Sequence, residues 1–133
     1  MSKPITDLDE LREDFRGKAR ELFHNLITYA NKKDSVHNYW IIETYRPQSR
    51  QDELYAQGRT TKGNIVTYAK HSKHTDRIAV DIAVTKNGSV DYDTSDRTIL
   101  SLYNQIGVEC KALGLIWGGD FKAKDLGHIE MEK

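Results

Sequence analysis

Three residues have the types and the setting of a metal site. Asp81 interrupts an apolar run from Ile78 to Val84, where a carboxylate is costly unless a cation or a hydrogen-bond donor pairs with it. His74 lies seven positions earlier in a polar stretch, and His128 lies near the end of the sequence. A loop that turns back over the strand would bring His74 to Asp81. Two histidines and one carboxylate form the ligand set of hydrolytic zinc enzymes, which leave a fourth position open for water.

Asp125 is the candidate proton carrier of such a site, because it lies three residues before His128. If His128 binds a metal, a short turn would place the Asp125 carboxylate beside the water at that metal. The carboxylate would then take a proton from the water and later give it to a leaving amine. The sequence therefore predicts metal-assisted hydrolysis with Asp125 as the general base and acid.

The spacing alone leaves structural interpretations open. A buried salt bridge, for which Arg46 is a candidate partner, would also explain Asp81. His74 would then be a solvated histidine in a basic loop, and His128 a partly exposed strand residue. His-x6-Asp and Asp-x2-His are weak patterns that need a structural context before they identify a site.

The elements that would position these residues follow from hydrophobic periodicity. A helix is predicted from about residue 7 to residue 29, with a cap at Thr6 or Asp7 and a break at Gly17. Two more helices are predicted at 47–58 and 95–114, four strands at 39–45, 78–84, 115–117 and 127–131, and a turn at 87–88. Because these elements show no regular βαβ rhythm, we expect an α+β fold in which helices pack on a small, mainly antiparallel sheet.

The composition limits the class of protein. A length of 133 residues fits one domain over residues 1–133, and twenty basic residues balance twenty acidic ones, which weighs against nucleic-acid binding. We find neither a secretory signal nor an apolar stretch of membrane-spanning length, so we expect a cytoplasmic protein without stable membrane association.

Cys110 is expected to be a buried helix residue. Asp91, Asp93 and Asp96 form an acidic loop, for which we prefer a solvated turn over a calcium site.

Four segments resemble, in order, the motifs of one family of zinc peptidases. Residues 72–81 resemble its S-x-H-x-x-G-x-A-x-D signature, and residues 125–130 resemble its second block, an acidic residue followed by x-x-H. Residues 115–121 resemble its W-G-G-D-W block, with Phe121 in place of the last aromatic residue, and residues 44–60 resemble its T-x-x-R and L-Y-x-x-G-R stretch. That family contains D-alanyl-D-alanine carboxypeptidases and dipeptidases and L-alanyl-D-glutamate endopeptidases, including bacteriophage endolysins.

The resemblance implies a role for each matching residue and a Hedgehog/D,D-peptidase type of fold. It makes His74, Asp81 and His128 the zinc ligands, Asp125 the catalytic acid and base, and Arg46 the cation that stabilises the oxyanion. A structural ion pair remains the alternative role for Arg46. The family residues that contact substrate correspond to three further positions: Ser72, Trp117 and Asp120. A loop turn, a core tryptophan and a turn aspartate are their respective structural alternatives.

One departure from the family pattern concerns the loop before Asp81. Arg77 occupies the position of the family glycine, which implies a changed loop, and its side chain could meet an anionic substrate. The acid and base residue at position 125 is aspartate, whereas some family members have glutamate there. In this respect the sequence resembles the L-alanyl-D-glutamate endopeptidase branch.

The resemblance leads to an expected function. We expect a monomeric zinc-dependent L-alanyl-D-glutamate endopeptidase that cuts the peptidoglycan stem peptide, acting as a phage endolysin without a separate cell-wall-binding domain. The enzyme would stay in the cytoplasm until it is released toward the wall. The alternatives are a D-alanyl-D-alanine carboxypeptidase or dipeptidase and a non-catalytic, metal-bearing wall-binding module.

Overall fold

The computed structural model describes residues 2–133, whose helices and strands appear in mixed order. The helices are a short 3-10 helix η1 (Leu8–Glu10), α1 (Glu13–Lys33), α2 (Gln48–Ala56), α3 (Arg97–Ala112) and a second 3-10 turn η2 (Gly118–Asp120). The strands are β1 (His37–Glu43), β2 (Ala79–Lys86), β3 (Ser89–Val90), β4 (Ile116–Trp117) and β5 (His128–Glu130). The chain from Gln57 to Ile78, between α2 and β2, contains no regular helix or strand.

The strands form one antiparallel sheet in the order β1-β2-β5-β4, with β3 paired to β2 as a hairpin. Asn87 and Gly88 form the hairpin turn with φ of 52° and 78°, and positive φ at both central residues is typical of a type I′ turn. The predicted α+β fold with a mainly antiparallel sheet is therefore confirmed, and the strand β3 was not foreseen.

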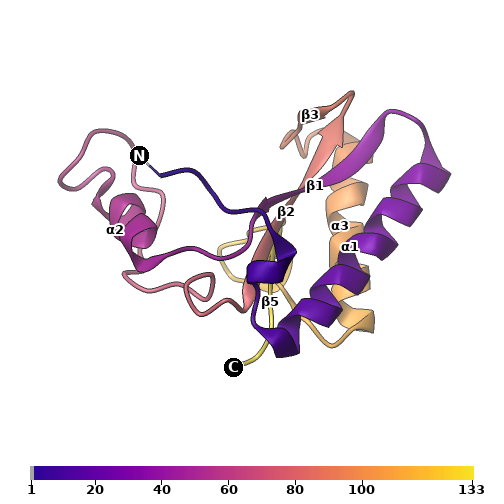
Figure 1. Cartoon of the computed structure of the whole chain (residues 1–133). Helices are drawn as coiled ribbons and strands as arrows, with labels where there is room; N and C mark the ends of the chain where they lie inside the picture. Colours follow the sequence, from indigo (N-terminus) through magenta and orange to yellow (C-terminus); the bar gives the residue numbers. More distant parts are fainter. Residues whose placement is uncertain (1) are drawn as a thin grey trace.

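The hydrophobic core lies between one face of the sheet and the two long helices. Figure 1 shows α1 and α3 side by side to the right of the strands, whereas α2 and the loop after it lie apart on the left. Phe15, Leu22 and Leu26 from α1 are fully buried there together with Ile99 and Leu102 from α3. Only one face of the sheet is covered by these helices, so the opposite face is left for a cleft.

The predicted break at Gly17 is wrong, although a break exists. Asp7 caps the short η1, the chain then turns at Leu11 and Arg12, and α1 runs without interruption through Gly17. A Cβ atom at Gly17 would meet nothing within 4 Å, so this glycine lies in open space on the helix. Glycine lowers helix stability by only about 0.5–1 kcal/mol, which the buried face of α1 easily outweighs.

Within residues 2–133, we find no helix that combines the length and the apolar composition required to cross a bilayer.

Candidate active site

The pairing of β2 with β5 brings Asp81 and His128 together. The two residues lie directly opposite each other in the antiparallel register, so their side chains project from the same face of the sheet. His128 Nδ1 lies 3.1 Å from Asp81 Oδ1. The other residues of β2 from Ala79 to Thr85 are buried, whereas Asp81 is half-buried. The carboxylate therefore faces the side of the sheet that α1 and α3 do not cover.

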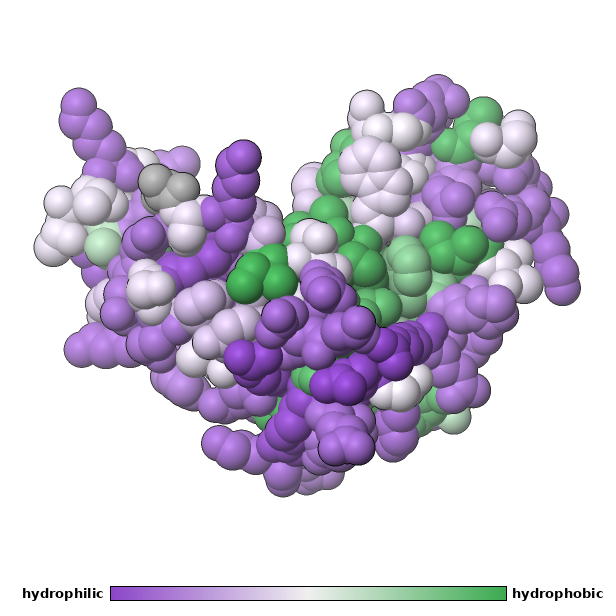
Figure 2. Space-filling model, in the orientation of Figure 1, coloured by the Kyte–Doolittle hydropathy of each residue, from purple (hydrophilic) through white to green (hydrophobic). Residues whose placement is uncertain are grey.

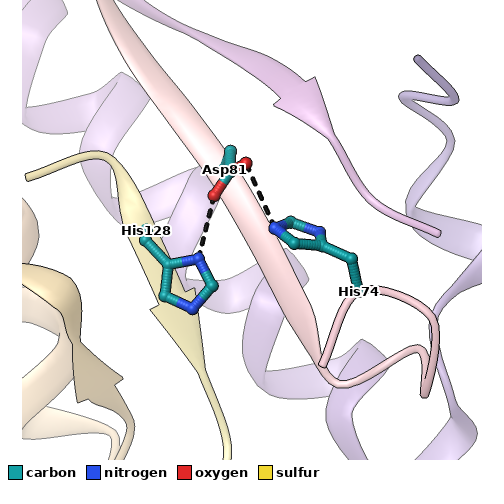
Figure 3. Close-up of side chains that lie close together, drawn as sticks. All are labelled: His74, Asp81 and His128. Carbon is teal, nitrogen blue, oxygen red and sulfur yellow. Dashed lines mark hydrogen bonds and ion pairs between the residues drawn. The ribbon is translucent and has the colours of Figure 1, made fainter. Parts of the chain in front are cut away.

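His74 reaches the same carboxylate from the turn before β2, and the end of β1 fixes its ring. Its Nδ1 lies 2.8 Å from the backbone oxygen of Thr44, and its own carbonyl accepts the backbone N–H of Arg46 at 3.1 Å. A carbonyl oxygen can only accept, so Nδ1 carries a proton, and Nε2 is the ring nitrogen that can offer a lone pair to a metal. That Nε2 atom lies 3.1 Å from Asp81 Oδ2, and Figure 3 shows both imidazole rings turned toward the carboxylate.

This geometry suits a metal ion. Donor atoms of His74, Asp81 and His128 all lie within 4.8 Å of one another. His74 Nε2 is buried and forms no hydrogen bond within residues 2–133, although it lies close to a carboxylate oxygen. A nitrogen lone pair and a carboxylate oxygen at 3.1 Å repel each other unless a proton or a metal cation lies between them. A nitrogen and carboxylate set of this size suits zinc.

Outer residues orient both histidines, as is usual around metal ligands. The carboxylate of Glu130 lies 2.9 Å from His128 Nε2 and can accept its proton, which would leave Nδ1 as the ligand atom on the Asp81 side when a metal is bound. Lys73 in turn forms an ion pair with Glu130. Glu130 was not predicted as part of the site, although strand alternation places residues 128 and 130 on the same face.

The charges of the group are strongly coupled. Burial favours the neutral acid at Asp81, but the hydrogen bond with His128 and the contact with His74 outweigh burial, and the pKa of Asp81 lies far below its ordinary value. Burial also opposes protonation of His128, yet Asp81 and Glu130 raise its pKa. Asp81 is therefore ionised near neutral pH and available to a cation.

Asp125 lies in the loop that leads into β5 and lines the same cleft as Asp81 and His128. Its backbone N–H donates to the Gly118 carbonyl at 2.9 Å, and its own carbonyl accepts from His128 N–H at 3.1 Å, which closes a tight turn. Desolvation and the negative charge of Asp81 raise the pKa of Asp125 above its ordinary value. A carboxyl group with a raised pKa is better suited to accept and return a proton near neutral pH.

Arg46 approaches the group from the residues that follow β1. Its Nη2 lies 4.0 Å from Asp81 Oδ2 and donates to Glu43 Oε1 at 2.8 Å, while its Nη1 donates to Gln51 Oε1 at 2.8 Å. Its Nε is buried and has no hydrogen bond within the described chain. The ion pair that we considered as the alternative role thus exists, mainly with Glu43, and it holds the guanidinium at the edge of the metal-ligand group.

The three residues expected to contact substrate lie in two places. Ser72 lines the cleft, and its hydroxyl accepts the backbone N–H of His74 at 3.1 Å. Trp117 and Asp120 instead line a separate pocket against α3 and are not among the described residues that line the cleft. The indole Nε1 of Trp117 donates to the Leu126 carbonyl at 2.8 Å, so this side chain supports the loop that carries Asp125. Their contact with substrate stays a prediction.

Arg77 keeps the backbone conformation that glycine would favour. Its φ is 64°, in the left-handed region, so the arginine has not removed the sharp turn before β2. Its guanidinium bonds to the Glu10 carboxylate at 2.8 Å and to the Glu10 carbonyl at 2.9 Å, and it stacks 3.7 Å from the Tyr45 ring. These contacts engage the side chain toward η1 rather than toward a substrate, which corrects the expectation of a changed loop.

The acidic residues from Asp91 to Asp96 bind backbone N–H groups, and Cys110 is buried. Asp91 and Asp93 accept backbone N–H groups two residues ahead, and Asp96 caps α3 by accepting from Thr98 and Ile99. Cys110 is buried as expected, and burial raises the pKa of its thiol to about 12.

The cleft has a volume of about 690 Å³ and separates two walls. One wall consists of sheet and loop residues around the metal-ligand group, and the other of residues from α2 and the following loop: Arg50, Leu54, Val66 and Thr67. In the space-filling view, the molecule is hollowed between the part that holds α2 and the part that holds α1 and α3 (Figure 2). A smaller pocket of about 280 Å³ adjoins the cleft at Asp81, Tyr92 and Asp125.

A family of known peptidases matches part of this chain. The family model described as D-alanyl-D-alanine carboxypeptidase matches residues 66–131, the segment that contains the three candidate ligands and Asp125. This match spans about half of the chain, the part that is similar to the peptidase family and that holds the group of side chains able to bind a metal ion.

Two relatives are informative. The chain is 44% identical over 98 residues to the peptidoglycan L-alanyl-D-glutamate endopeptidase CwlK of Bacillus subtilis, a match that covers 68% of this chain and 59% of CwlK. The chain thus spans less than two thirds of the length of that relative. The fold is similar to the crystal structure of the L-Ala D-Glu endopeptidase ChiX of Serratia marcescens, with a TM-score of 0.60 and 23% identity over 94% of this chain and 83% of that one.

Proposed function

We propose that the protein is a zinc-dependent L-alanyl-D-glutamate endopeptidase that cleaves the stem peptide of bacterial peptidoglycan. The observation that carries the proposal is the group of His74, Asp81 and His128 at the floor of an open cleft, with Asp125 and Arg46 beside it. The similarity to CwlK supports the choice of the L-alanyl-D-glutamate bond.

The protein would hold the zinc ion through His74 Nε2, the Asp81 carboxylate and His128 Nδ1, the atoms that the Thr44 carbonyl and Glu130 leave available. When bound, zinc would supply a Lewis acid that polarises the scissile carbonyl and acidifies water. Metal identity is part of the proposal and follows from the nitrogen and oxygen donors.

The side chains around this group would move the proton and stabilise the developing charge. Asp125 takes a proton from the attacking water as the water oxygen bonds to the carbonyl carbon of L-alanine. Asp125 then gives that proton to the D-glutamate nitrogen as the carbon–nitrogen bond breaks. Arg46 faces the carbonyl oxygen while it carries negative charge, and Ser72 contacts the peptide.

A role as a bacteriophage endolysin, held in the cytoplasm until release, is the finer form of this proposal. It is supported by the resemblance of the four sequence motifs, since that family includes such enzymes. Expression in a Gram-negative host should leave cells intact until the inner membrane is permeabilised, and lysis should then follow. Lysis without permeabilisation would contradict storage in the cytoplasm.

Mass spectrometry of fragments released from purified peptidoglycan tests the reaction. We expect stem peptides that begin at D-glutamate, lost with a chelator and restored by zinc, and no release by the Asp125→Asn variant. Removal of terminal D-alanine alone would favour the carboxypeptidase activity that the family description names. Absence of any release by metal-loaded protein would refute the peptidase proposal and leave the wall-binding alternative.

A further inference from the structure

The α2 wall of the cleft carries an arginine that the proposed mechanism does not use. The Arg50 side chain is only 11% exposed and lines the cleft together with Arg46 and the candidate ligands. Its Nε donates to Glu43 Oε2 at 2.6 Å and its Nη1 donates to the Ser2 carbonyl at 2.7 Å. Within residues 2–133 its Nη2 makes no hydrogen bond, and this atom does not belong to the buried, unpaired groups. One edge of the guanidinium is therefore held while Nη2 remains available.

Glu43 links this arginine to Arg46. The Glu43 side chain is 5% exposed, and its second oxygen accepts from Arg46 Nη2 at 2.8 Å. Burial alone would favour the neutral acid, but the hydrogen bonds from Arg46 and Arg50 outweigh it and lower the pKa of Glu43. Two guanidinium groups thus share the Glu43 carboxylate, and Arg46 also lies 4.0 Å from Asp81 Oδ2. Within residues 2–133, the ion pair of Arg50 is therefore with a carboxylate that it shares. The neighbouring residues of the wall, Leu54, Val66 and Thr67, are neutral.

The substrate of the proposed reaction offers a matching anion. A glutamate inside a peptide chain uses one carboxyl group for the next peptide bond and keeps the other free. In the stem peptide this free carboxylate lies beside the scissile nitrogen, and diaminopimelate, the following residue, carries another. A planar guanidinium is well suited to bind a carboxylate through charge-assisted hydrogen bonds.

We propose that Arg50 binds a free carboxylate of the stem peptide on the D-glutamate side of the scissile bond, and so contributes to substrate specificity. The inference rests on the proposed function and adds the orientation of the bound peptide in the cleft. The D-glutamate side of the peptide lies toward α2, and the L-alanine side, with the attached sugar, lies toward Tyr92 and the smaller pocket. Glu43 acts as a positioning residue, because it fixes Arg50 and Arg46 at a constant separation.

Matched peptides provide the test. The first is L-Ala-γ-D-Glu-diaminopimelate with its chain-end carboxyl group amidated. The second carries a further carboxamide at the free glutamate carboxylate, and the third carries it at the remaining free diaminopimelate carboxylate. Because a hydrogen bond to a charged group contributes roughly tenfold to a hundredfold in binding, one carboxamide should lower kcat/KM by about that factor. The carboxamide that does so identifies the source of the anion. Equal kcat/KM values on all three peptides would overturn the inference.

Variants separate recognition from structural support. Arg50→Gln should bring the ratio of kcat/KM on the free acid to kcat/KM on the carboxamide close to one. Arg50→Lys should keep part of the preference, because lysine retains the positive charge but lacks the planar guanidinium. Lys62→Gln, an exposed cation in the loop after α2, is the control and should keep the full ratio. If Arg50→Gln lowers kcat/KM equally on all peptides, its role is only structural and the inference is wrong.

A binding measurement distinguishes failure of this inference from failure of the proposed function. Calorimetric titration of the Asp125→Asn protein with the same peptides measures Kd without turnover. Tighter binding of the free acid than of the amide, lost with Arg50→Gln, supports the carboxylate site even if no peptide is cleaved. Cleavage of all peptides without any preference for the free acid leaves the endopeptidase proposal intact and refutes the role of Arg50.

Discussion

Gly118 lies where the loop carrying Asp125 presses against the residues that follow β4, and alanine at this position should damage the site. A Cβ atom built on Gly118 would lie 2.2 Å from the Asp125 carbonyl oxygen and 2.9 Å from His128 Cβ. Side-chain carbons essentially never approach other heavy atoms below 3.0 Å, so the Asp125 carbonyl would have to move by about 0.8 Å, the difference between 3.0 and 2.2 Å. That carbonyl accepts the His128 N–H, so the shift would reach both the candidate base and a candidate ligand.

The expected cost has two parts. Overfilling a packed position destabilises a protein by about 1–3 kcal/mol, and a misplacement near 1 Å in an active site lowers the rate by about a hundredfold. We expect Gly118→Ala to lower Tm by about 4 °C for each kcal/mol lost and to lower kcat/KM by about a hundredfold. The control is Gly17→Ala, which meets nothing within 4 Å and should raise stability by about 0.5–1 kcal/mol with full activity. Calorimetry and a peptide-cleavage assay measure both effects, and a Gly118→Ala enzyme with unchanged Tm and kcat/KM would refute the reasoning.

Three further predictions concern single residues. Because Arg77 has a φ of 64°, Arg77→Ala should be about 0.5–1 kcal/mol less stable than Arg77→Gly in urea unfolding, and equal stability would show that the turn is not left-handed. Because burial raises the pKa of Cys110 to about 12, its thiol should resist alkylation at pH 8 in the folded protein and react in urea, and rapid native labelling would contradict the burial. Hydrogen bonds from the backbone and then the side chain of His37 lower the pKa of Asp34 from 3.8 to about 2, so the stability that this carboxylate contributes should be complete above about pH 4 and lost as the pH falls through 2. The stability difference between wild type and Asp34→Ala should shrink over that interval, and a difference independent of pH would contradict the shift.

The sequence was sufficient for the fold class and for most elements, because these depend on local patterns. The alternation and the β-branched residues of β1 and β2 are visible in the sequence, as are the periodic apolar positions of α1 and α3. The boundaries moved by about two residues where tertiary contacts compete. Thr44, expected inside the first strand, instead bonds to the Ile5 carbonyl and turns its own carbonyl to His74.

The candidate ligands could be predicted because burying the Asp81 carboxylate in an apolar strand costs free energy unless it has a partner. The same argument applied to Glu43 and Glu130, two carboxylates in strand-like runs, would have indicated their buried partners. The pairing of Glu43 with Arg50 could not be predicted in this way, because it depends on where α2 packs. The position of Trp117 likewise depends on tertiary packing, since its ring fits against the backbone of Gly107 and Gly119 rather than into the cleft.

The left-handed turn at Arg77 shows a limit of pattern matching. A changed residue at a glycine position suggested a changed loop, but the contacts with Glu10 and Tyr45 compensate for a conformation that costs about 1–2 kcal/mol. Such compensation comes from residues far apart in the sequence and becomes visible only in the folded chain.

The most direct test of the account is a zinc titration of chelator-treated protein, followed in parallel by metal analysis and by release of stem peptides from peptidoglycan. We predict that activity rises in proportion to bound zinc and saturates at one ion per chain. The Asp81→Asn and His128→Gln variants, which should remain folded by circular dichroism, should bind less than a tenth of that zinc at the same free concentration. Full activity of a protein that contains no bound metal, or unchanged zinc binding by both variants, would contradict the assignment of His74, Asp81 and His128 as the catalytic metal site.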